Sequence, residues 1–404
     1  MRIGLLAPAS RRCGGTFQYT YSLLEALLNY SKYKQDLFIL TNKEVIVKDL
    51  EGCKDLIVLD IKPSNLLLKG LRVLYVNFPF IRNFLDVSGN YKIIKKLPID
   101  LIIIPIISLA PLYSNKPYII TIHDLQHKYY PEFFTVKERL TRNYVYRNAA
   151  KNAMFIVCES QFVKSDIIKF LGISSDKIRI IPSVPPSYLV NLEIKVDYLK
   201  EIKTKYELPE RFLLYPAQFW YHKNHINLLK AISLIIKKYK EDISVIFVGL
   251  KKNNFENTMN EMKRLKLENH VKYLGYVPDK DIPYLYKLSI ALVMPTLFES
   301  VSMPIWEAFY LGCPVVSSEI CALPEQISDA GLLFNPYDVK DMAEKIYKIW
   351  TDEKLRERFI KKGHERVKGL TIENYTRQWE KVIAEALKQV RKVGRTMQGA
   401  YSER

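Results

Sequence analysis

The sequence has little cysteine, and its cysteines form no pattern that supports chemistry. Its 404 residues include five cysteines, which are widely scattered: Cys13, Cys53, Cys158, Cys313 and Cys321. No pair has the CxxC spacing of a zinc or redox motif, and an odd, scattered set is a poor basis for disulfides. We therefore expect neither a structural metal nor disulfide bonds, and we expect a reducing, cytoplasmic location.

Long hydrophobic runs are also missing. The most apolar stretch, 101–112, contains two prolines and is shorter than the roughly 20 residues that a membrane helix needs. It fits a buried parallel strand better. The apolar run at the start of the chain is too short for the core of a secretory leader. We expect no leader and no transmembrane segment.

Acidic residues are too few to balance the basic ones. Lys and Arg number 61 against 43 Asp and Glu, so the formal net charge is +18. This excess favours anionic partners, whether phosphorylated ligands, nucleic acid or an acidic membrane. No RNA- or DNA-binding motif is present, so nucleic acid is not expected. Between Lys62 and Lys96, basic and large apolar residues are interleaved, which fits either a patch for anionic lipid or a solvated basic face over the core.

The length of the chain predicts two domains. Short apolar runs alternate with helix-like segments, which is typical of parallel sheets with helices on both faces. The proline-containing stretch Ile181–Asp197 interrupts this alternation, so we place a boundary near residue 186. The predicted fold is α/β, with two doubly wound, Rossmann-like domains facing a cleft. The predicted parts are 1–186, 187–370, the closing amphipathic helix 371–393 and a polar tail, 394–404.

Two glutamates surround a predicted helix start. Glu299 follows the strand-like run 289–296, and Glu307 lies about one turn into a helix that begins near Pro304. Backbone N–H groups of 300–303 would form an anion site there, and Glu307 could hold the two hydroxyls of a ribose. Alternatively, both are solvated carboxylates that the helix dipole favours. The flanking strand, proline and glycine favour the ligand-binding interpretation.

Lys223 precedes another predicted helix, after the strand-like run Phe212–Tyr215. A cation there could clamp a diphosphate from the side opposite the 300–303 terminus. The alternative is an ordinary surface lysine. His222 and His225 have no carboxylate or cysteine nearby in the sequence, so we expect packing or loop roles for them rather than a metal site.

Glycines follow the first predicted strand. Gly14 and Gly15 would let a phosphate or sugar approach the backbone closely, and a plain turn is the alternative. The loop is not GxGxxG, and no acidic residue is well placed for the ribose of NAD, so a dinucleotide is disfavoured.

His123 and Asp124 directly follow a later strand-like run. Polar pairs at the carboxyl end of a strand usually face a ligand, although Asp124 could instead cap a helix. His123 and His127 are spaced i, i+4, but no third ligand accompanies them, so a metal is not expected.

Taken together and in this order, these motifs resemble the retaining glycosyltransferases of family 4, which have the GT-B fold. The resemblance covers nearly the whole chain, and Glu-x7-Glu with its flanks is its most specific part. It rests on the Gly14–Gly15 loop and on HDLQH, YPEFF, VCESQFVKSDIIKFLG, YPAQFWYHKNHINLLKAI, YLGYVP, FESVSMPIWEA and GCPVVSSEICALPE. The family implies an acceptor-binding N-terminal domain and a donor-binding C-terminal domain.

The resemblance also implies roles in binding a nucleotide sugar. Glu307 would hold the ribose, Glu299 the transferred sugar and Lys223 the diphosphate. The remaining implied contacts are the backbone of Val301, Ser302 and Met303 at the sugar and phosphates, Val277 at the base, His123 near the sugar, Gly15 by the β-phosphate and Asp124 toward the acceptor.

Two departures from the family pattern concern the donor. Gln218 stands where the family often has an arginine as a second diphosphate cation. The common EGFGLP is ESVSMP here, so Ser300 and Ser302 narrow the room around the sugar. The HDL and YPEFF motifs favour a mannose-like sugar and polysaccharide or O-antigen assembly.

The implied reaction is retaining transfer of a hexose from a UDP- or GDP-linked sugar to a glycan or lipid-linked acceptor, without a metal or other cofactor. The enzyme would act in the cytoplasm, in possible peripheral contact with an anionic membrane. The alternatives are a nucleotide-sugar epimerase of the same fold and a basic nucleic-acid-binding protein. An epimerase needs no acceptor, and a nucleic-acid-binding protein would bind oligonucleotides with steep salt dependence.

Overall fold

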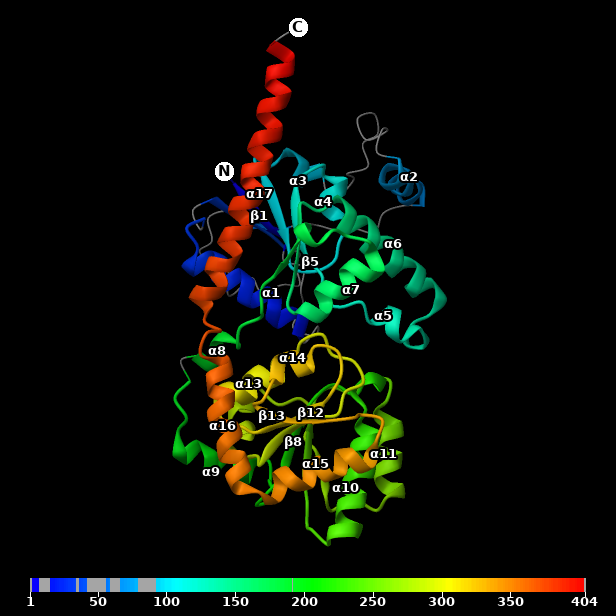
Figure 1. Ribbon diagram of the computed structural model, residues 1–404, viewed down its shortest axis with the longest axis vertical. Coiled ribbons are helices and arrows are strands. Elements are labelled where there is room, and N and C mark those ends of the chain that lie inside the picture. The colour runs from blue at the N-terminus through cyan, green and yellow to red at the C-terminus, as the bar shows by residue number, and fades with distance from the viewer. Residues whose placement is uncertain are drawn as a thin grey trace. The chain divides into compact units, whose positions relative to one another are not determined.

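The chain folds into two compact units. The computed structural model describes residues 2–6, 15–33, 36–41, 56–58, 66–78, 92–190 and 192–402. Unit 1 contains Met1–Ser183 and Ile372–Arg404, and unit 2 contains Val184–Thr371. The division falls a few residues before the predicted boundary at 186. The C-terminal helix returns to unit 1, so the red helix of Figure 1 belongs with the blue and cyan segments.

Unit 1 is built on one parallel sheet. Within the described residues its strand order is β3-β2-β1-β4-β5-β6-β7, and every pairing is parallel. The strands are β1 (Ile3–Leu6), β2 (Leu37–Thr41), β3 (Leu56–Val58), β4 (Leu101–Ile104), β5 (Tyr118–Thr121), β6 (Phe155–Cys158) and β7 (Ile178–Ile180). Residues of β1, β4, β5 and β6 are buried throughout, because helices cover both faces of a doubly wound sheet.

The helices of unit 1 start and stop at recognisable signals. Thr135 and Glu138 form a capping box at the start of α6, and Gly172 ends α7 with φ of 66°. The helices are α1 (Gly15–Glu25), η2 (Ala26–Tyr30), α2 (Leu66–Asn77), α3 (Lys92–Lys96), α4 (Ala110–Tyr113), α5 (Gln126–Tyr129), η7 (Pro131–Phe133), α6 (Val136–Asn152), α7 (Gln161–Leu171), η8 (Ser175–Lys177) and α17 (Ile372–Ser402). Helices α6 and α7 pack against each other (Figure 1).

The last helix is longer than predicted. Helix α17 runs from Ile372 to Ser402, so the predicted helix end at residue 393 is wrong, and the segment predicted as a polar tail is helical as far as Ser402. The segment contains Gly394 and Gly399 but no proline. A glycine lowers helix stability by only about 1 kcal/mol and does not end a helix by itself. Tyr375 and Trp379 of α17 are buried, which anchors the helix in unit 1.

Unit 2 has the strand order β10-β9-β8-β11-β12-β13, again with parallel pairings. Its strands are β8 (Leu213–Pro216), β9 (Val245–Val248), β10 (Val271–Tyr273), β11 (Ala291–Met294), β12 (Val315–Ser318) and β13 (Gly331–Phe334). Its helices are α8 (Ser187–Val190), α9 (Val196–Lys205), η9 (Tyr221–Lys223), α10 (His225–Tyr239), α11 (Phe255–Arg264), α12 (Ile282–Leu288), α13 (Met303–Leu311), α14 (Leu323–Ile327), α15 (Val339–Thr351) and α16 (Glu353–Val367).

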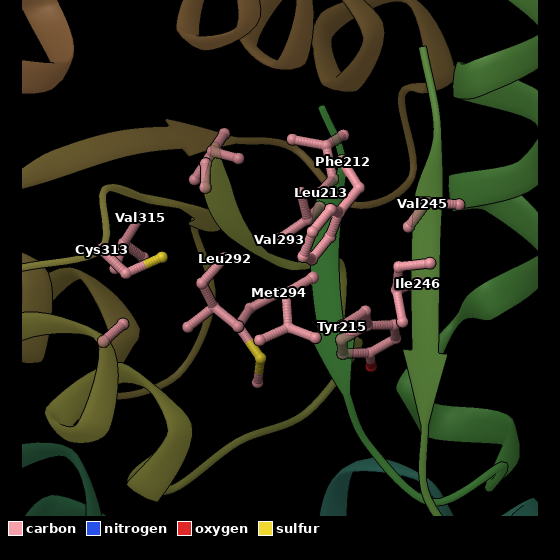
Figure 2. Packing of buried hydrophobic residues seen from close by; sticks show 14 of the residues in the cluster. Phe212, Leu213, Tyr215, Val245, Ile246, Leu292, Val293, Met294, Cys313 and Val315 are labelled. Carbon is pink, nitrogen blue, oxygen red and sulfur yellow. The ribbon is translucent and has the colours of Figure 1, made fainter. Parts of the chain in front are cut away.

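The core of unit 2 fills the space around its central strands. Figure 2 shows side chains of β8, β9 and β11 and of the segment entering β12 packed together. Helix α10 packs against α15, and α13 against α16. The predicted α/β class with two doubly wound parallel sheets is confirmed.

Candidate functional site

The strand order of unit 2 identifies where a ligand would bind. Strand β8 lies beside β11, while β9 and β10 extend to one side and β12 and β13 to the other. The chain therefore changes direction between β8 and β11, and in open α/β sheets ligands bind in the crevice at the carboxyl ends of such strands. The loop after β8 carries Lys223, and the loop after β11 carries Glu299. The tertiary fold thus brings the two predicted residues to the same edge.

Hydrogen bonds hold these two loops together. The Leu297 N–H donates to the carbonyl of His222 at 2.7 Å, and the Thr296 hydroxyl donates to the same carbonyl at 3.0 Å. Asn224 takes a left-handed conformation, with φ of 58°, and its side-chain amide donates to the carbonyls of Pro295 and Pro336. The backbone on both sides of Lys223 is therefore fixed to the loop that leads to Glu299.

Lys223 and Glu299 form an ion pair, with the ammonium donating to Oε2 of the carboxylate. Each side chain keeps 17% of its surface exposed, so both charges remain within reach of a ligand. A diphosphate would compete with Glu299 for the ammonium, because it is also an anionic acceptor. In this structure the cation predicted to bind the diphosphate, Lys223, is therefore paired with the carboxylate predicted to contact the sugar, Glu299.

The start of α13 is held by a glutamine that the sequence interpretation missed. Gln326 on α14 accepts from the Ser302 N–H at 2.9 Å and donates to the Ser302 carbonyl at 2.7 Å. In this structure the Ser302 N–H is therefore engaged by Gln326, and the anion site expected from the N–H groups of 300–303 stays a prediction. The Ser302 hydroxyl is buried, and it has no hydrogen-bond partner within the part of the chain that the structure describes.

Glu307 receives two phenol hydrogen bonds. Tyr188 of α8 donates to Oε1 at 3.1 Å, and Tyr286 of α12 donates to Oε2 at 2.7 Å. Burial raises the pKa of the Glu307 carboxyl, and the two phenols oppose that rise. Each carboxylate oxygen can accept more than one hydrogen bond, so the arrangement can still receive the hydroxyls of a ribose. In a chain with 27 tyrosines, nothing in the sequence singles out these two.

The other predicted donor contacts of unit 2 lie in neighbouring loops. Gln218 accepts from the Trp220 indole at 3.1 Å. A Cβ on Gly249, which has φ of 144°, would lie 2.5 Å from the Ala217 carbonyl oxygen, so only glycine fits beside this loop. Val277 is buried in the core of unit 2, and only its backbone could meet a base. Ser300, Val301 and Met303 stay partly exposed around the start of α13.

In unit 1, the predicted glycine loop is only partly described. Gly14 lies outside the described residues. Gly15 begins α1, and a Cβ there would meet nothing within 4 Å. No described residue therefore crowds this position, and its role beside a phosphate stays a prediction.

His123 is enclosed by acceptors and by an aromatic ring. Its Nδ1 lies 2.7 Å from Oε2 of Glu159, and its Nε2 lies 2.8 Å from the Pro105 carbonyl oxygen. The ring meets that of Tyr19 edge to face, with 4.6 Å between centroids. Asp124, which follows, accepts from the Gln126 N–H at 2.9 Å. That contact is a local turn before α5, and the N-cap of α5 is Leu125 rather than Asp124.

The remaining histidines of the sequence motifs have packing roles. His127 is buried between Phe134 and Tyr146 and lies 3.1 Å from the Asn143 side chain. Burial, with Arg142 and Lys128 nearby, lowers its pKa to about 4. Burial likewise lowers the pKa of His222 and of His225 to about 3. Among the described residues, no group of three His, Cys, Asp or Glu side chains could hold a metal ion.

Within the residues that the structure describes, no helix is both long and apolar enough to cross a bilayer.

Two doubly wound domains, with charged loops at the strand switch point of the second, are typical of α/β proteins that bind a ligand at the carboxyl ends of their strands. Two family models match most of the chain. Glycosyltransferase Family 4 matches residues 14–183, and Glycosyl transferases group 1 matches residues 200–366. The chain therefore belongs to the GT-B-type glycosyltransferases of this family, and the predicted family and enzyme class are confirmed.

Curated relatives share moderate identity. The O-antigen chain mannosyltransferase B of Escherichia coli is 29% identical over 266 residues, which cover 64% of this chain and 68% of that protein. The O-antigen chain mannosyltransferase RfbU of Salmonella typhimurium is 27% identical over 240 residues, covering 59% and 62%. The serotype-specific mannosyltransferase WbdA of Escherichia coli is 28% identical over 204 residues, half of this chain and 25% of WbdA.

Solved structures share the fold at lower identity. HepE of Anabaena, solved with UDP and glucose, has a TM-score of 0.71 and 18% identity, covering 95% of this chain and all of that one. WaaG, a glycosyltransferase involved in lipopolysaccharide biosynthesis, has a TM-score of 0.68 and 14% identity, covering 94% and 99%. These likenesses confirm the predicted GT-B architecture.

Proposed function

We propose that this enzyme is a retaining hexosyltransferase that moves a mannosyl group from a nucleoside diphosphate sugar. The acceptor would be a glycan or a lipid-linked glycan in the assembly of a cell-surface polysaccharide. The observation that carries the proposal is the Lys223–Glu299 ion pair at the strand switch point, whose carboxylate lies in the loop that leads to α13, the helix that carries Glu307. The names of the mannosyltransferase relatives support the choice of sugar and pathway class.

The proposed chemistry follows from where charge develops. Breaking the bond between the anomeric carbon and the phosphate oxygen leaves an oxocarbenium-like sugar and a diphosphate. Lys223 would move from Glu299 to the diphosphate and stabilise the leaving charge. Glu299, then released, would accept hydrogen bonds from the sugar hydroxyls, and Glu307 would accept those of the ribose. No metal is required by this scheme, because the cation comes from the chain itself.

Retention follows from attack on the face that the diphosphate leaves. The acceptor hydroxyl would bond to the anomeric carbon as the bond to phosphate breaks, and its proton would pass to the departing phosphate oxygen. The atoms balance without a covalent sugar–enzyme intermediate. NMR of the anomeric configuration in the product tests this, and an inverted product would refute it.

The donor can be tested by thermal shift with UDP, GDP, ADP and their common sugars, without added metal. A ligand at 100 times its Kd should stabilise the protein by about 2.7 kcal/mol. We expect one nucleotide series to stabilise the wild type and to lose most of this effect in Glu307→Gln. Glu344→Gln is the matched control, because Glu344 is 59% exposed and pairs with Lys238. Equal loss in both variants, or no shift with any nucleotide, would overturn the donor assignment.

Acceptor dependence separates transfer from the epimerase alternative. A transferase releases the nucleoside diphosphate at a rate that rises with an added glycan acceptor. An epimerase instead converts the donor sugar with no acceptor present. Mass spectrometry of the sugar products distinguishes these two outcomes.

We also propose peripheral contact of unit 1 with an anionic membrane at the cytoplasmic face. Four large apolar side chains between residues 73 and 93 are nearly half exposed: Val73, Leu74, Phe78 and Ile93. Lys95 and Lys96 follow them, and such a mixture suits an anionic interface. Lys62 and Arg82 of the predicted patch lie outside the described residues. Cosedimentation with phosphatidylglycerol vesicles should fall in Leu74→Ser, while equal binding to phosphatidylcholine vesicles would refute the proposal.

A further inference from the structure

We propose that Glu159 and Ser183 are positioning residues that hold His123 as a doubly donating imidazolium, so that His123 cannot be the base for the acceptor hydroxyl. The part that concerns turnover rests on the proposed transfer function. The part that concerns the ring itself does not.

The network is assembled from the ends of four neighbouring strands. Pro105 follows β4, His123 follows β5, Glu159 follows β6 and Ser183 follows β7. These four strands are consecutive in the sheet of unit 1, so their carboxyl ends lie along one edge. Because β4 is next to β1 at the strand switch point, this is the edge where ligands of such sheets bind.

Every polar atom of the His123 ring faces an oxygen acceptor. A carbonyl oxygen cannot donate, so Nε2, 2.8 Å from the Pro105 oxygen, must carry a proton. Nδ1 lies 2.7 Å from Oε2 of Glu159. The other carboxylate oxygen, Oε1, accepts from the hydroxyl of Ser183, so both oxygens of Glu159 are engaged as acceptors. The consistent assignment is an imidazolium that donates from both nitrogens to Glu159 and Pro105.

One proton lies between Nδ1 of His123 and Oε2 of Glu159. Whichever of the two atoms holds it, the His123 ring has no nitrogen lone pair that is free to accept a proton from a substrate. If the proton moved to Glu159, Nδ1 would accept it back along the same 2.7 Å contact, and Nε2 would still donate to Pro105. A general base must offer a free lone pair within hydrogen-bond reach of the proton it takes. His123 offers none, and this leaves the departing phosphate to take the acceptor proton.

The surrounding charges favour the protonated ring. Burial is the largest influence and lowers the pKa of His123, but the hydrogen bond and charge of Glu159, the Pro105 carbonyl and Asp124 together raise it above the usual value. On α1, Tyr19 presents its ring to the imidazole and places its hydroxyl 3.1 Å from the Thr121 hydroxyl. Burial holds the pKa of the Tyr19 phenol well above its usual range, so this neighbour stays neutral.

The two possible roles of His123, an imidazolium that donates hydrogen bonds and a general base, predict opposite dependences of activity on pH. If the protonated ring of His123 is the form in which the enzyme is active, activity persists at pH values below the raised pKa of His123. Activity then falls as the pH rises through that pKa. A general base would instead lose activity as the pH falls. Removing the charge of Glu159 should move the alkaline limb to lower pH, by about 1–3 units, because an opposite charge at this distance shifts a pKa by that amount.

The experiment records the ring nitrogens of the full-length protein labelled with 15N-histidine. At pH 7 the wild type should show two protonated ring nitrogens for His123, identified by the signal lost in His123→Asn. Glu159→Gln should lose the second proton at a lower pH than the wild type does, and Ser183→Ala should shift in the same direction by less. His127, with its pKa of about 4, is an internal control that stays singly protonated throughout.

Activity completes the test, with GDP-mannose as the donor probe and release of GDP as the readout. The alkaline limb of kcat should move to lower pH in Glu159→Gln, and circular dichroism should show a wild-type fold. An unmoved limb, or a singly protonated His123 in the wild type, would overturn the inference. If the wild type transfers no sugar from any tested donor, the proposed function fails, while the NMR result still decides the state of the ring.

Discussion

Replacing Lys223 by alanine removes the cation that pairs with Glu299 and, in the proposed reaction, with the leaving diphosphate. The two side chains are each only 17% exposed, so Glu299 would be left as a partly desolvated charge with no ammonium beside it. Breaking a fully buried pair costs about 3–5 kcal/mol. Because this pair is in contact with water, we expect a smaller loss, about 1–3 kcal/mol in the free energy of unfolding.

The effect of Lys223→Ala on kcat should be larger than its effect on stability, and the two effects can be measured separately. One preorganised group that stabilises developing charge is worth about 2.7–4 kcal/mol, so Lys223→Ala should lower kcat by roughly 10²–10³. Steady-state release of the nucleoside diphosphate gives kcat, and urea denaturation of the same preparations gives stability.

Two further variants make the test sharp. Lys238→Ala breaks a pair whose members are 51% and 59% exposed, so it should change stability little, because water screens exposed pairs, and it should leave kcat unchanged. In Lys223→Ala with Glu299→Gln, the unpaired charge is gone, so part of the stability should return while kcat stays low. A kcat for Lys223→Ala within about tenfold of the wild type would refute the assignment of Lys223 to the diphosphate.

Three other predictions concern the surroundings of the same site. Gln326→Ala removes both hydrogen bonds to Ser302, each worth about 0.5–1.5 kcal/mol, so urea denaturation should show lower stability and steady-state kinetics a higher KM for the donor. Tyr188→Phe removes a phenol that lowers the pKa of Glu307. The carboxyl should then protonate at a higher pH, and calorimetry should show donor affinity falling earlier as the pH is lowered from 8 to 5. An unchanged pH dependence would exclude Glu307 as the group that binds in its ionised form. Gly249→Ala should destabilise the protein by more than about 1–3 kcal/mol, because φ of 144° is strained for alanine and its Cβ would collide with the Ala217 carbonyl; a wild-type urea midpoint would contradict the backbone geometry.

The sequence was informative where local pattern carries the signal. Apolar runs between helix-like segments predicted two parallel sheets, because strands buried on both faces need apolar residues at every position. Glu299, Glu307 and Lys223 were predicted as site residues from their places after strands and at helix starts. The predicted end of the last helix at residue 393 was wrong, because α17 continues to Ser402.

The partners of the functional side chains were decided by the tertiary structure alone. Tyr188 lies 119 positions from Glu307, and Glu159 lies 36 positions from His123. No local propensity links residues so far apart. For Glu159 and His123 the doubly wound order of the strands does so, because it gathers distant strand ends at one edge of the sheet. Tyr188 and Glu307 instead come from two helices of unit 2, α8 and α13. The sequence therefore determined the fold class and the family and predicted the charged residues of the candidate site. The contacts of His123 depend on which strand ends the fold places side by side, and those of Glu307 depend on which helices it places side by side.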